Sequence, residues 1–354
     1  MKYNIQKYFT CFLSFALCLL LFSSCVKDTP PEPTTTVTSI NSNNKVYIIN
    51  EGQFNLVPGN SNISLYDATT GTVIENFYSQ QNSNAILGDV CQSMTKYNNN
   101  YYIVVNNSHK IEVTSGYDLK QTATISGFNS PRYILPITYS KAYVSDLYAS
   151  TIQIVDLNTN TIIGSIPSYS NTEKMALIYN KAFVTCSSNN YCYVINTITD
   201  MVTDSINVGK GASSIIVDKN SKVWVLASGG SSASQVGKLV RINPVTLQIE
   251  LNLAFTSADS PKQLCINKTH DTLYYLNKGI CQFPIINGAL PASPLVNQDS
   301  KIYYGLGVNP IDYNIYVSDA IDYVQKSMIE IYSVNGSFKK SFHAGYISNG
   351  FVFE

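Results

Sequence analysis

Few of the residue types that usually carry chemistry stand at useful spacings in this chain. Only three histidines occur, His109, His270 and His343, and no ligand spacing joins them, so a zinc site is not expected. The sequence contains no glycine-rich phosphate loop, no Gly-x-Ser-x-Gly and no His-Glu-x-x-His. We therefore expect no resident metal or cofactor and no catalytic centre of those kinds.

Three carboxylates occupy the same position of a repeated sequence motif. Glu51, Asp146 and Asp319 each follow a short run of strand-forming residues, so we expect them to ring one face of the fold. Two carboxylates at a fixed separation are what glycoside hydrolysis requires. Alternatively, each one caps the tight turn that follows it through side-chain hydrogen bonds.

Aromatic and amide side chains are concentrated in long insertions and nearby turns, which we expect on that same face. The insertions are EGQFNLVPGNSN, SQQNSNAILGDVCQ, SGGSSASQVG and SDAIDYVQKSM. Such residues combine flat apolar contact with hydrogen bonding at a low entropic cost. The candidate ligand contacts taken from this set are Gln53, Phe54, Asn55, Tyr148, Tyr169, Tyr323 and Tyr346. The alternative is that the tyrosines only cover the outside of a β protein.

A second set of polar residues stands where predicted strands begin. Aligning these strand starts gives Gln92, Arg132, Lys174, Ser213, Lys262, Tyr304 and Asn349. The set is polar and partly cationic, and Arg132 and Lys174 are taken from it as further candidate ligand contacts. The alternative is that the whole set only keeps a channel mouth solvated.

The elements that must position these side chains are clearest in residues 132–167. This stretch divides into four short strands, RYILPIT, KAYVSD, IQIVDL and IIGSIP, which are rich in β-branched and aromatic residues and separated by turn-forming ones. Both faces of the third strand are largely apolar, as expected for a sheet packed between two others. One such sheet cannot bury both faces alone, so it needs copies on either side.

The copies are found by aligning one aromatic residue of the second strand. The anchors are Tyr47, Tyr102, Tyr143, Phe183, Trp224, Tyr274 and Tyr316, separated by 55, 41, 40, 41, 50 and 42 residues. A period of about 40–45 residues with four strands per unit is typical of propeller blades. We therefore predict an all-β fold, a seven-bladed β-propeller with four-stranded blades.

The two ends of the repeat array predict how the ring closes. The first anchor has no strand before it, and the C-terminal residues form a strand that is left over. Pairing Asn349–Phe353 with Val46–Asn50 completes the first blade and leaves no free edge. The prolines of the sixth repeat, in CQFPIINGALPASPLV, suit only an outer strand.

The N-terminal residues predict export and lipidation. Residues 1–24 contain two lysines, an apolar run of 14 residues and a small pair before Cys25, which is typical of a lipoprotein signal peptide. The apolar run is shorter than the ~20 residues that a spanning helix needs. We expect Cys25 to carry lipid, residues 25–44 to form a flexible tether and residues 45–354 to form the propeller.

The net charge and the cysteine content narrow the possible classes of protein further. Without the two signal-peptide lysines, 21 basic residues stand against 23 acidic ones, which argues against nucleic-acid binding. Five cysteines follow the lipidated one, and an odd number argues against a full disulfide framework. Cys186 and Cys192 flank a predicted hairpin, where either a disulfide or two free thiols fits. Cys265 and Cys281 belong to strands that are too far apart to bridge.

Several phrases resemble a known group of proteins. Pro-Arg-Tyr-Ile and Lys-Ala-Tyr-Val-Ser-Asp, within residues 131–146, and their echoes in later repeats resemble the YncE-type seven-bladed propellers. Val26-Lys27-Asp28 resembles the signal by which Bacteroidetes lipoproteins reach the outer face. Together, these features resemble the surface lipoproteins of gut Bacteroidetes that capture cobalamin for the outer-membrane vitamin B12 transporter.

The resemblance implies a location, a ligand and a partner. It places the protein on the outer membrane, held by lipid alone and facing the cell exterior. Cobalamin would be a transported ligand rather than a cofactor, and a TonB-dependent outer-membrane transporter would receive it. The aromatic candidates would give flat contacts, while the amide and cationic candidates would address amide groups or the nucleotide-loop phosphate.

Two other functions stay open at this point. A surface propeller that binds a glycan or a protein is one, although glycan sites commonly display tryptophan and Trp224, the only one, stands at a core position. A propeller lyase or hydrolase is the other. It would need converging bases, which the sequence does not show, so we expect a protein that is not an enzyme.

Overall fold

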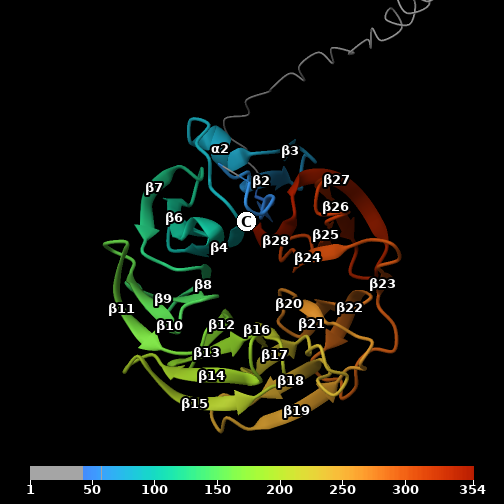
Figure 1. Ribbon diagram of the computed structural model, residues 1–354. Coiled ribbons are helices and arrows are strands. Elements are labelled where there is room, and N and C mark those ends of the chain that lie inside the picture. The colour runs from blue at the N-terminus through green and yellow to red at the C-terminus, as the bar shows by residue number, and fades with distance from the viewer. Residues whose placement is uncertain (1–42, 57) are drawn as a thin grey trace, which may run out of the picture. The chain divides into compact units, whose positions relative to one another are not determined.

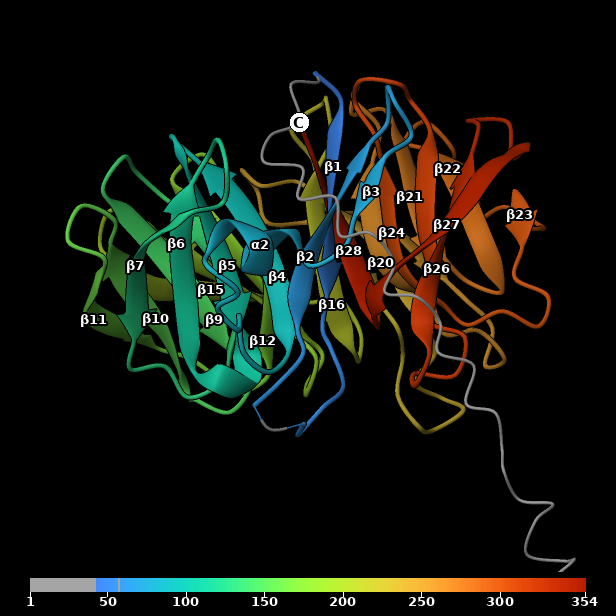
Figure 2. The same ribbon diagram turned by 90° about the horizontal axis from the view of Figure 1, so that it is seen from above.

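A computed structural model describes residues 43–56 and 58–354 of the chain. Within them, seven four-stranded antiparallel sheets stand around a common axis, as Figure 1 shows in a view along that axis. Figure 2 shows the same ring turned by 90°. The prediction of an all-β, seven-bladed propeller is confirmed. The predicted signal peptide, Cys25 and most of the predicted tether lie outside the described residues.

The strands of each blade follow one another from the axis outward. Blade one contains β28 (Ser348–Phe353), β1 (Lys45–Asn50), β2 (Asn62–Asp67) and β3 (Val73–Ile74). Blade two contains β4 (Cys91–Tyr97), β5 (Asn100–Val105), β6 (Lys110–Ser115) and β7 (Gln121–Ser126). Blade three contains β8 (Pro131–Pro136), β9 (Lys141–Asp146), β10 (Thr151–Asp156) and β11 (Thr161–Pro167).

The remaining four blades repeat this order. Blade four contains β12 (Thr172–Ile178), β13 (Lys181–Cys186), β14 (Tyr191–Asn196) and β15 (Met201–Asn207). Blade five contains β16 (Ala212–Val217), β17 (Val223–Ala227), β18 (Lys238–Ile242) and β19 (Ile249–Ala254). Blade six contains β20 (Lys262–Ile266), β21 (Thr272–Leu276), β22 (Gly279–Pro284) and β23 (Val296–Asn297). Blade seven contains β24 (Tyr303–Val308), β25 (Ile315–Asp319), β26 (Lys326–Tyr332) and β27 (Phe338–Tyr346).

The apolar core is divided into layers between neighbouring blades. All seven predicted anchors lie on second strands and are at most 2% exposed. Tyr102 and Val104 of blade two, for example, pack in one cluster with Ile134 and Val144 of blade three. Each blade therefore buries its two faces against its neighbours, which is why a single blade could not be stable alone.

The ring closes through the C-terminal strand. β28 pairs antiparallel with β1, and Val46 stands opposite Phe353 while Asn50 stands opposite Ser348. Lys45 and Glu354 exchange two further backbone hydrogen bonds, of 2.9 and 2.8 Å. The predicted closure is confirmed, and it removes the free edge that the first blade would otherwise present.

Two helical turns interrupt the strands. A short helix, α2 (Phe77–Gln81), was not expected from the sequence, and it packs against β2 with Phe77 and Tyr78 buried. The helix follows β3, the outer strand of blade one. Because β3 is only two residues long, the helix covers a part of the blade that this strand leaves open. The 3-10 turn η1 (Asn106–Ser108) follows β5. Neither described helix has the length and apolar character needed to cross a membrane.

All five cysteines of the described residues are free thiols, so the possible Cys186–Cys192 disulfide does not form. The register explains this, because Thr185, and not Cys186, stands opposite Cys192. Successive side chains of a strand point to opposite faces of the sheet. Cys192 accordingly packs in the core toward blade five, whereas Cys186 packs in the core toward blade three.

Candidate ligand-binding site

The inner strands of the seven blades surround a cavity of about 760 Å³ on the axis of the ring. This volume falls within the usual range for small-molecule sites, about 300–1,000 Å³. Polar and charged residues line the cavity where the inner strands begin. Apolar residues line it toward the ends of the same strands, among them Ile216, Ile266, Val308 and Phe353. The cavity therefore has a polar end and an apolar end.

A β-bulge near the start of every inner strand presents the polar side chains. In each sheet the register between inner and second strand shifts there and leaves one or two inner-strand residues unpaired. Bulges re-aim side chains and are common beside functional sites. The first unpaired residues, here called the mouth ring, all line the cavity: Gln92, Arg132, Glu173, Ser213, Gln263, Tyr304 and Asn349.

Hydroxyl groups of the second strands hold three of these bulges. Ser318 Oγ accepts a hydrogen bond from Gly305 N at 2.7 Å, and Thr185 Oγ1 donates one to the Lys174 carbonyl oxygen at 2.8 Å. Ser145 makes the equivalent contact in blade three. Each hydroxyl comes from the second-strand residue that the register shift leaves without a partner. The serine or threonine at this point of the repeat therefore stabilises the bulge.

The three carboxylates that follow second strands divide into two roles. Asp146 accepts hydrogen bonds from backbone N–H groups of two loops, the shortest from Ser130 N at 2.7 Å. Asp319 likewise accepts from Ile321 N at 2.9 Å. These two residues are turn caps, as one of the two interpretations of the sequence predicts. Glu51, by contrast, lines the cavity.

Glu51 is held at the polar end by neutral donors. Tyr304 Oη donates to its two oxygens at 3.2 and 3.1 Å, and Asn349 Nδ2 donates to Oε1 at 2.9 Å. Asn349 Nδ2 also lies 3.0 Å from the Gln92 carbonyl oxygen. Burial raises the pKa of Glu51, and the hydrogen bonds from Asn349 and Tyr304 oppose that rise.

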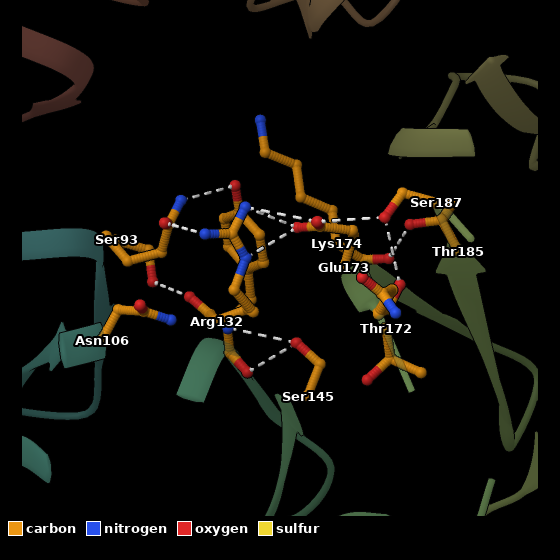
Figure 3. Close-up of polar contacts among 12 residues, drawn as sticks. Ser93, Asn106, Arg132, Ser145, Thr172, Glu173, Lys174, Thr185 and Ser187 are labelled. Atoms are coloured by element: carbon orange, nitrogen blue, oxygen red, sulfur yellow. Dashed lines mark hydrogen bonds and ion pairs between the residues drawn. The ribbon is translucent and has the colours of Figure 1, made fainter. Parts of the chain in front are cut away.

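An ion pair also lies at the polar end, and the charge of its Arg132 opposes the rise that burial causes in the pKa of Glu51. The Arg132 guanidinium donates to Glu173 through Nε at 3.0 Å and through Nη2 at 3.2 Å, and it also donates to Gln92 Oε1 (Figure 3). Gln92 Nε2 in turn donates to Tyr133 Oη at 3.2 Å. This network joins the inner strands of blades two, three and four, so Arg132 and Glu173 neutralise each other within the cavity lining.

Two lysines reach the cavity without such a partner. Lys174 Nζ lies 5.7 Å from the centre of the Tyr133 ring, and Lys262 Nζ lies 5.6 Å from the centre of the Tyr304 ring. No hydrogen bond or ion pair to another described residue holds either ammonium, and Figure 3 shows the Lys174 side chain extended away from the network. Burial lowers the pKa of both lysines.

Four of the predicted ligand contacts line the cavity. Arg132 and Lys174 do so at the polar end, as described above. Phe54 and Tyr148 stand at the rim, where they are 68% and 67% exposed. The structure thus brings together two cations and two exposed aromatic side chains from separate parts of the sequence.

The two predicted amide contacts form other pairs. Gln53 Oε1 accepts from Asn60 Nδ2 at 3.2 Å, and Asn55 Oδ1 accepts from Asn107 Nδ2 at 3.2 Å. Both residues lie in the loop that joins β1 to β2 and outside the cavity lining. Their amide groups stabilise that loop.

Three predicted tyrosine contacts also lie outside the cavity lining. Tyr169 stacks on Tyr193 with ring centres 4.9 Å apart. Tyr323 meets the Tyr304 ring edge-on at 5.8 Å, so it packs against a mouth-ring residue. Tyr346 is partly buried at the end of β27. The structure does not bring these three side chains together with Phe54 and Tyr148.

The aligned strand starts predict the cavity lining better than the aromatic and amide residues of the loops do. All seven residues of that alignment line the cavity, although only two of them were taken as candidate contacts. The bulge register corrects the alignment at two positions, because Glu173 and Gln263 occupy the mouth ring where the alignment has Lys174 and Lys262. Glu173 and Gln263 were missed because a register shift of one or two residues leaves no mark in the sequence pattern.

Metal ligation finds little support in the described part of the chain, where no group of three or more His, Cys, Asp or Glu residues stands close enough to hold an ion. The polar end of the cavity instead offers amide, hydroxyl, guanidinium and ammonium donors. Such donors recognise carbonyl, amide and anionic groups.

These features define the class of the protein as a seven-bladed β-propeller with a polar axial cavity. The chain belongs to the family described as "Domain of unknown function (DUF5074)", whose model matches residues 44–353. No curated protein matches the sequence.

Solved structures share the fold at low identity. A quinonprotein alcohol dehydrogenase-like protein from Bacteroides thetaiotaomicron matches with a TM-score of 0.71 and 12% identity, covering 88% of this chain and 78% of that one. A functionally unknown protein from Desulfotomaculum acetoxidans matches at 0.67 and 14%, covering 88% and 99%. The periplasmic gluconolactonase of Pseudomonas aeruginosa matches at 0.64 and 9%, covering 87% and 99%. At these identities the likeness concerns the fold alone.

Proposed function

We propose that this protein is a binding propeller that captures a small molecule at the polar end of its axial cavity. The observation that carries the proposal is the mouth ring, in which seven bulged inner strands contribute polar side chains to the lining of one cavity. Concave sites with a few convergent polar groups are the usual form of small-molecule sites. The exposed rings of Phe54 and Tyr148 add flat apolar contact at the rim.

Binding without catalysis fits the cavity best. Among the described lining residues there is no histidine, and burial raises the pKa of the lining thiol, Cys265, to about 12. The lining groups that could still act as a base are Glu51, whose pKa burial raises, and Lys174 and Lys262, whose pKa burial lowers. The carboxylates Glu51 and Glu173 already accept hydrogen bonds from Tyr304 and Arg132.

Cobalamin is the ligand we propose to test first. The resemblance of the sequence to cobalamin-capturing lipoproteins motivates it, and the donors of the mouth ring suit a ligand edged with amide groups. A ligand that broad would lie across the mouth ring, with Phe54 and Tyr148 against its flat parts. In this proposal lipid on Cys25 holds the propeller at the outer membrane, and a TonB-dependent transporter receives the ligand.

The test is a titration of cyanocobalamin into the full chain purified in detergent. Tyr148→Ala should weaken binding about tenfold, the cost of a typical aromatic contact at a binding surface. Tyr139→Ala is the matched control, because Tyr139 is 73% exposed but lies outside the cavity lining. No binding at micromolar concentrations would exclude cobalamin. A loss with Tyr169→Ala as large as that with Tyr148→Ala would move the site away from the axis.

A further inference from the structure

The two unpaired lysines of the cavity come from the blades on either side of blade five. Lys174 belongs to β12 of blade four, and Lys262 belongs to β20 of blade six. Lys174 Nζ lies over the Tyr133 ring of blade three, and Lys262 Nζ lies over the Tyr304 ring of blade seven, so the two ammonium groups enter the cavity from different blades. Between them blade five contributes the small residues Ser213 and Ser214 at the polar end and Ile216 toward the apolar end.

Charges within the cavity lining do not balance. Its cations are Arg132, Lys174 and Lys262, and its anions are Glu51 and Glu173. Glu173 is paired with Arg132, and Glu51 accepts its hydrogen bonds from neutral donors. Removing an unpaired charge from water is costly, so buried cations in proteins are normally paired. The lining keeps two cations that it does not pair.

Aromatic rings hold these cations without neutralising them. Each ammonium lies over a tyrosine face, Lys174 over Tyr133 and Lys262 over Tyr304, at a distance suited to a cation–π contact. A ring offers no lone pair to the three N–H donors of an ammonium group. Both lysines therefore keep donors that an anion entering the cavity can accept from.

We propose that Lys174 and Lys262 together form a subsite for an anionic group of the ligand, a phosphate or a carboxylate. The subsite rests on the proposed function, since it lies in the same cavity, and it adds the chemical class of the group that is recognised. Arg132 does not belong to the subsite, because Glu173 already accepts two of its hydrogen bonds. Two charge-assisted contacts from two different blades would fix the orientation of the ligand.

The first experiment compares two corrinoids that differ in the anionic group. Cyanocobalamin carries a phosphate in its nucleotide loop, and dicyanocobinamide lacks that loop. Each is titrated into the wild type and into the Lys174→Met/Lys262→Met variant, with the full chain in detergent. We expect the variant to bind cyanocobalamin at least about tenfold more weakly and dicyanocobinamide unchanged.

The control removes the same number of charges elsewhere. Lys268→Met/Lys339→Met alters two exposed lysines outside the cavity lining, and its affinity should match that of the wild type. If the Lys174→Met/Lys262→Met variant does not fold, as judged by circular dichroism, Lys174→Gln/Lys262→Gln replaces it. Equal affinity for cyanocobalamin in the cavity and control variants would overturn the subsite and leave the proposed function intact.

A second probe covers the case in which cobalamin does not bind at all. Inorganic pyrophosphate is then titrated at constant ionic strength into the wild type and the two variants. Binding that is lost only in the cavity variant supports the subsite, although the ligand proposed above would be wrong. Failure of the wild type to bind pyrophosphate as well, or equal binding by all three proteins, would overturn the subsite.

Discussion

The two ends of the axial cavity are built from the same seven strands in different ways. At the mouth ring the inner strands are bulged and carry polar residues such as Arg132 and Glu173. At the far end the same strands run in regular register, and apolar residues such as Ile266 and Phe353 line the cavity. The connections differ too. Long insertions follow the second strands at the mouth, whereas β12 and β13 join at the far end through Tyr179-Asn180, both at positive φ.

This difference shows how a packing strand becomes the edge of a binding site. In regular register, successive side chains point to alternate faces of a blade and are buried between blades. A bulge leaves a residue unpaired and turns its side chain, here toward the axis. Arg132, Glu173 and Gln92 of the mouth ring are then held by one another, and Tyr304 and Asn349 by Glu51, so the two ends should respond differently to substitution.

Removing the last nine residues should have the largest effect, because β28 serves both ends at once. It supplies Asn349 to the mouth ring and Phe353 to the far end, and it is the inner partner of β1. We expect the truncated chain to melt at least about 10 °C lower or to lose cooperative unfolding in a thermal scan.

The control for this truncation is Glu354→Gln. That change removes only a partly exposed ion pair with Lys96, so its melting temperature should stay within about 2 °C of the wild type. A truncated chain that melts with the wild type would show that neither end depends on ring closure.

Breaking the ion pair of the mouth ring should have the next largest effect. Arg132→Ala leaves the Glu173 carboxylate, only 7% exposed, without its cation, and the expected loss is about 3 kcal/mol of unfolding free energy. Arg132→Met/Glu173→Leu removes both charges and should cost less than about 1 kcal/mol. Urea denaturation measures both values.

An exposed ion pair provides the reference for that measurement. Lys120 and Asp118 are 65% and 36% exposed, so Lys120→Ala should change the free energy by less than about 0.5 kcal/mol. If Arg132→Ala lowers the free energy of unfolding no more than Lys120→Ala does, the ion pair and its hydrogen bonds do not stabilise the mouth ring.

The smallest effect is expected from removing single hydroxyl groups, and it should differ between a hydroxyl that stabilises a bulge and one that does not. Ser318 Oγ accepts from Gly305 N and donates to the Ser348 carbonyl oxygen, so Ser318→Ala should cost about 1–2 kcal/mol. Thr114 Oγ1 is also buried but has no hydrogen-bond partner among the described residues, so Thr114→Val should cost nothing or stabilise slightly. Equal costs in urea denaturation would mean that the bulge does not need the hydroxyl.

The sequence by itself determined the blades, their number and the closure of the ring. The anchors from Tyr47 to Tyr316 and the leftover strand at Asn349–Phe353 were sufficient for this. The physical reason is that strand alternation and turn residues are local, and a repeated local pattern can be counted. The polar strand starts also belong to this class, since all of them line the cavity.

Only the tertiary structure decided which side chains meet. Tyr304 Oη reaches Glu51 across 253 positions of sequence, a contact that exists only in a closed ring. Glu173 enters the mouth ring beside Arg132, while Lys174 stays free of the ion pair, because a bulge shifts the register and a one-residue slip reverses the face of a side chain. The local pattern specifies a strand and its faces, but the register at a bulge depends on neighbouring strands.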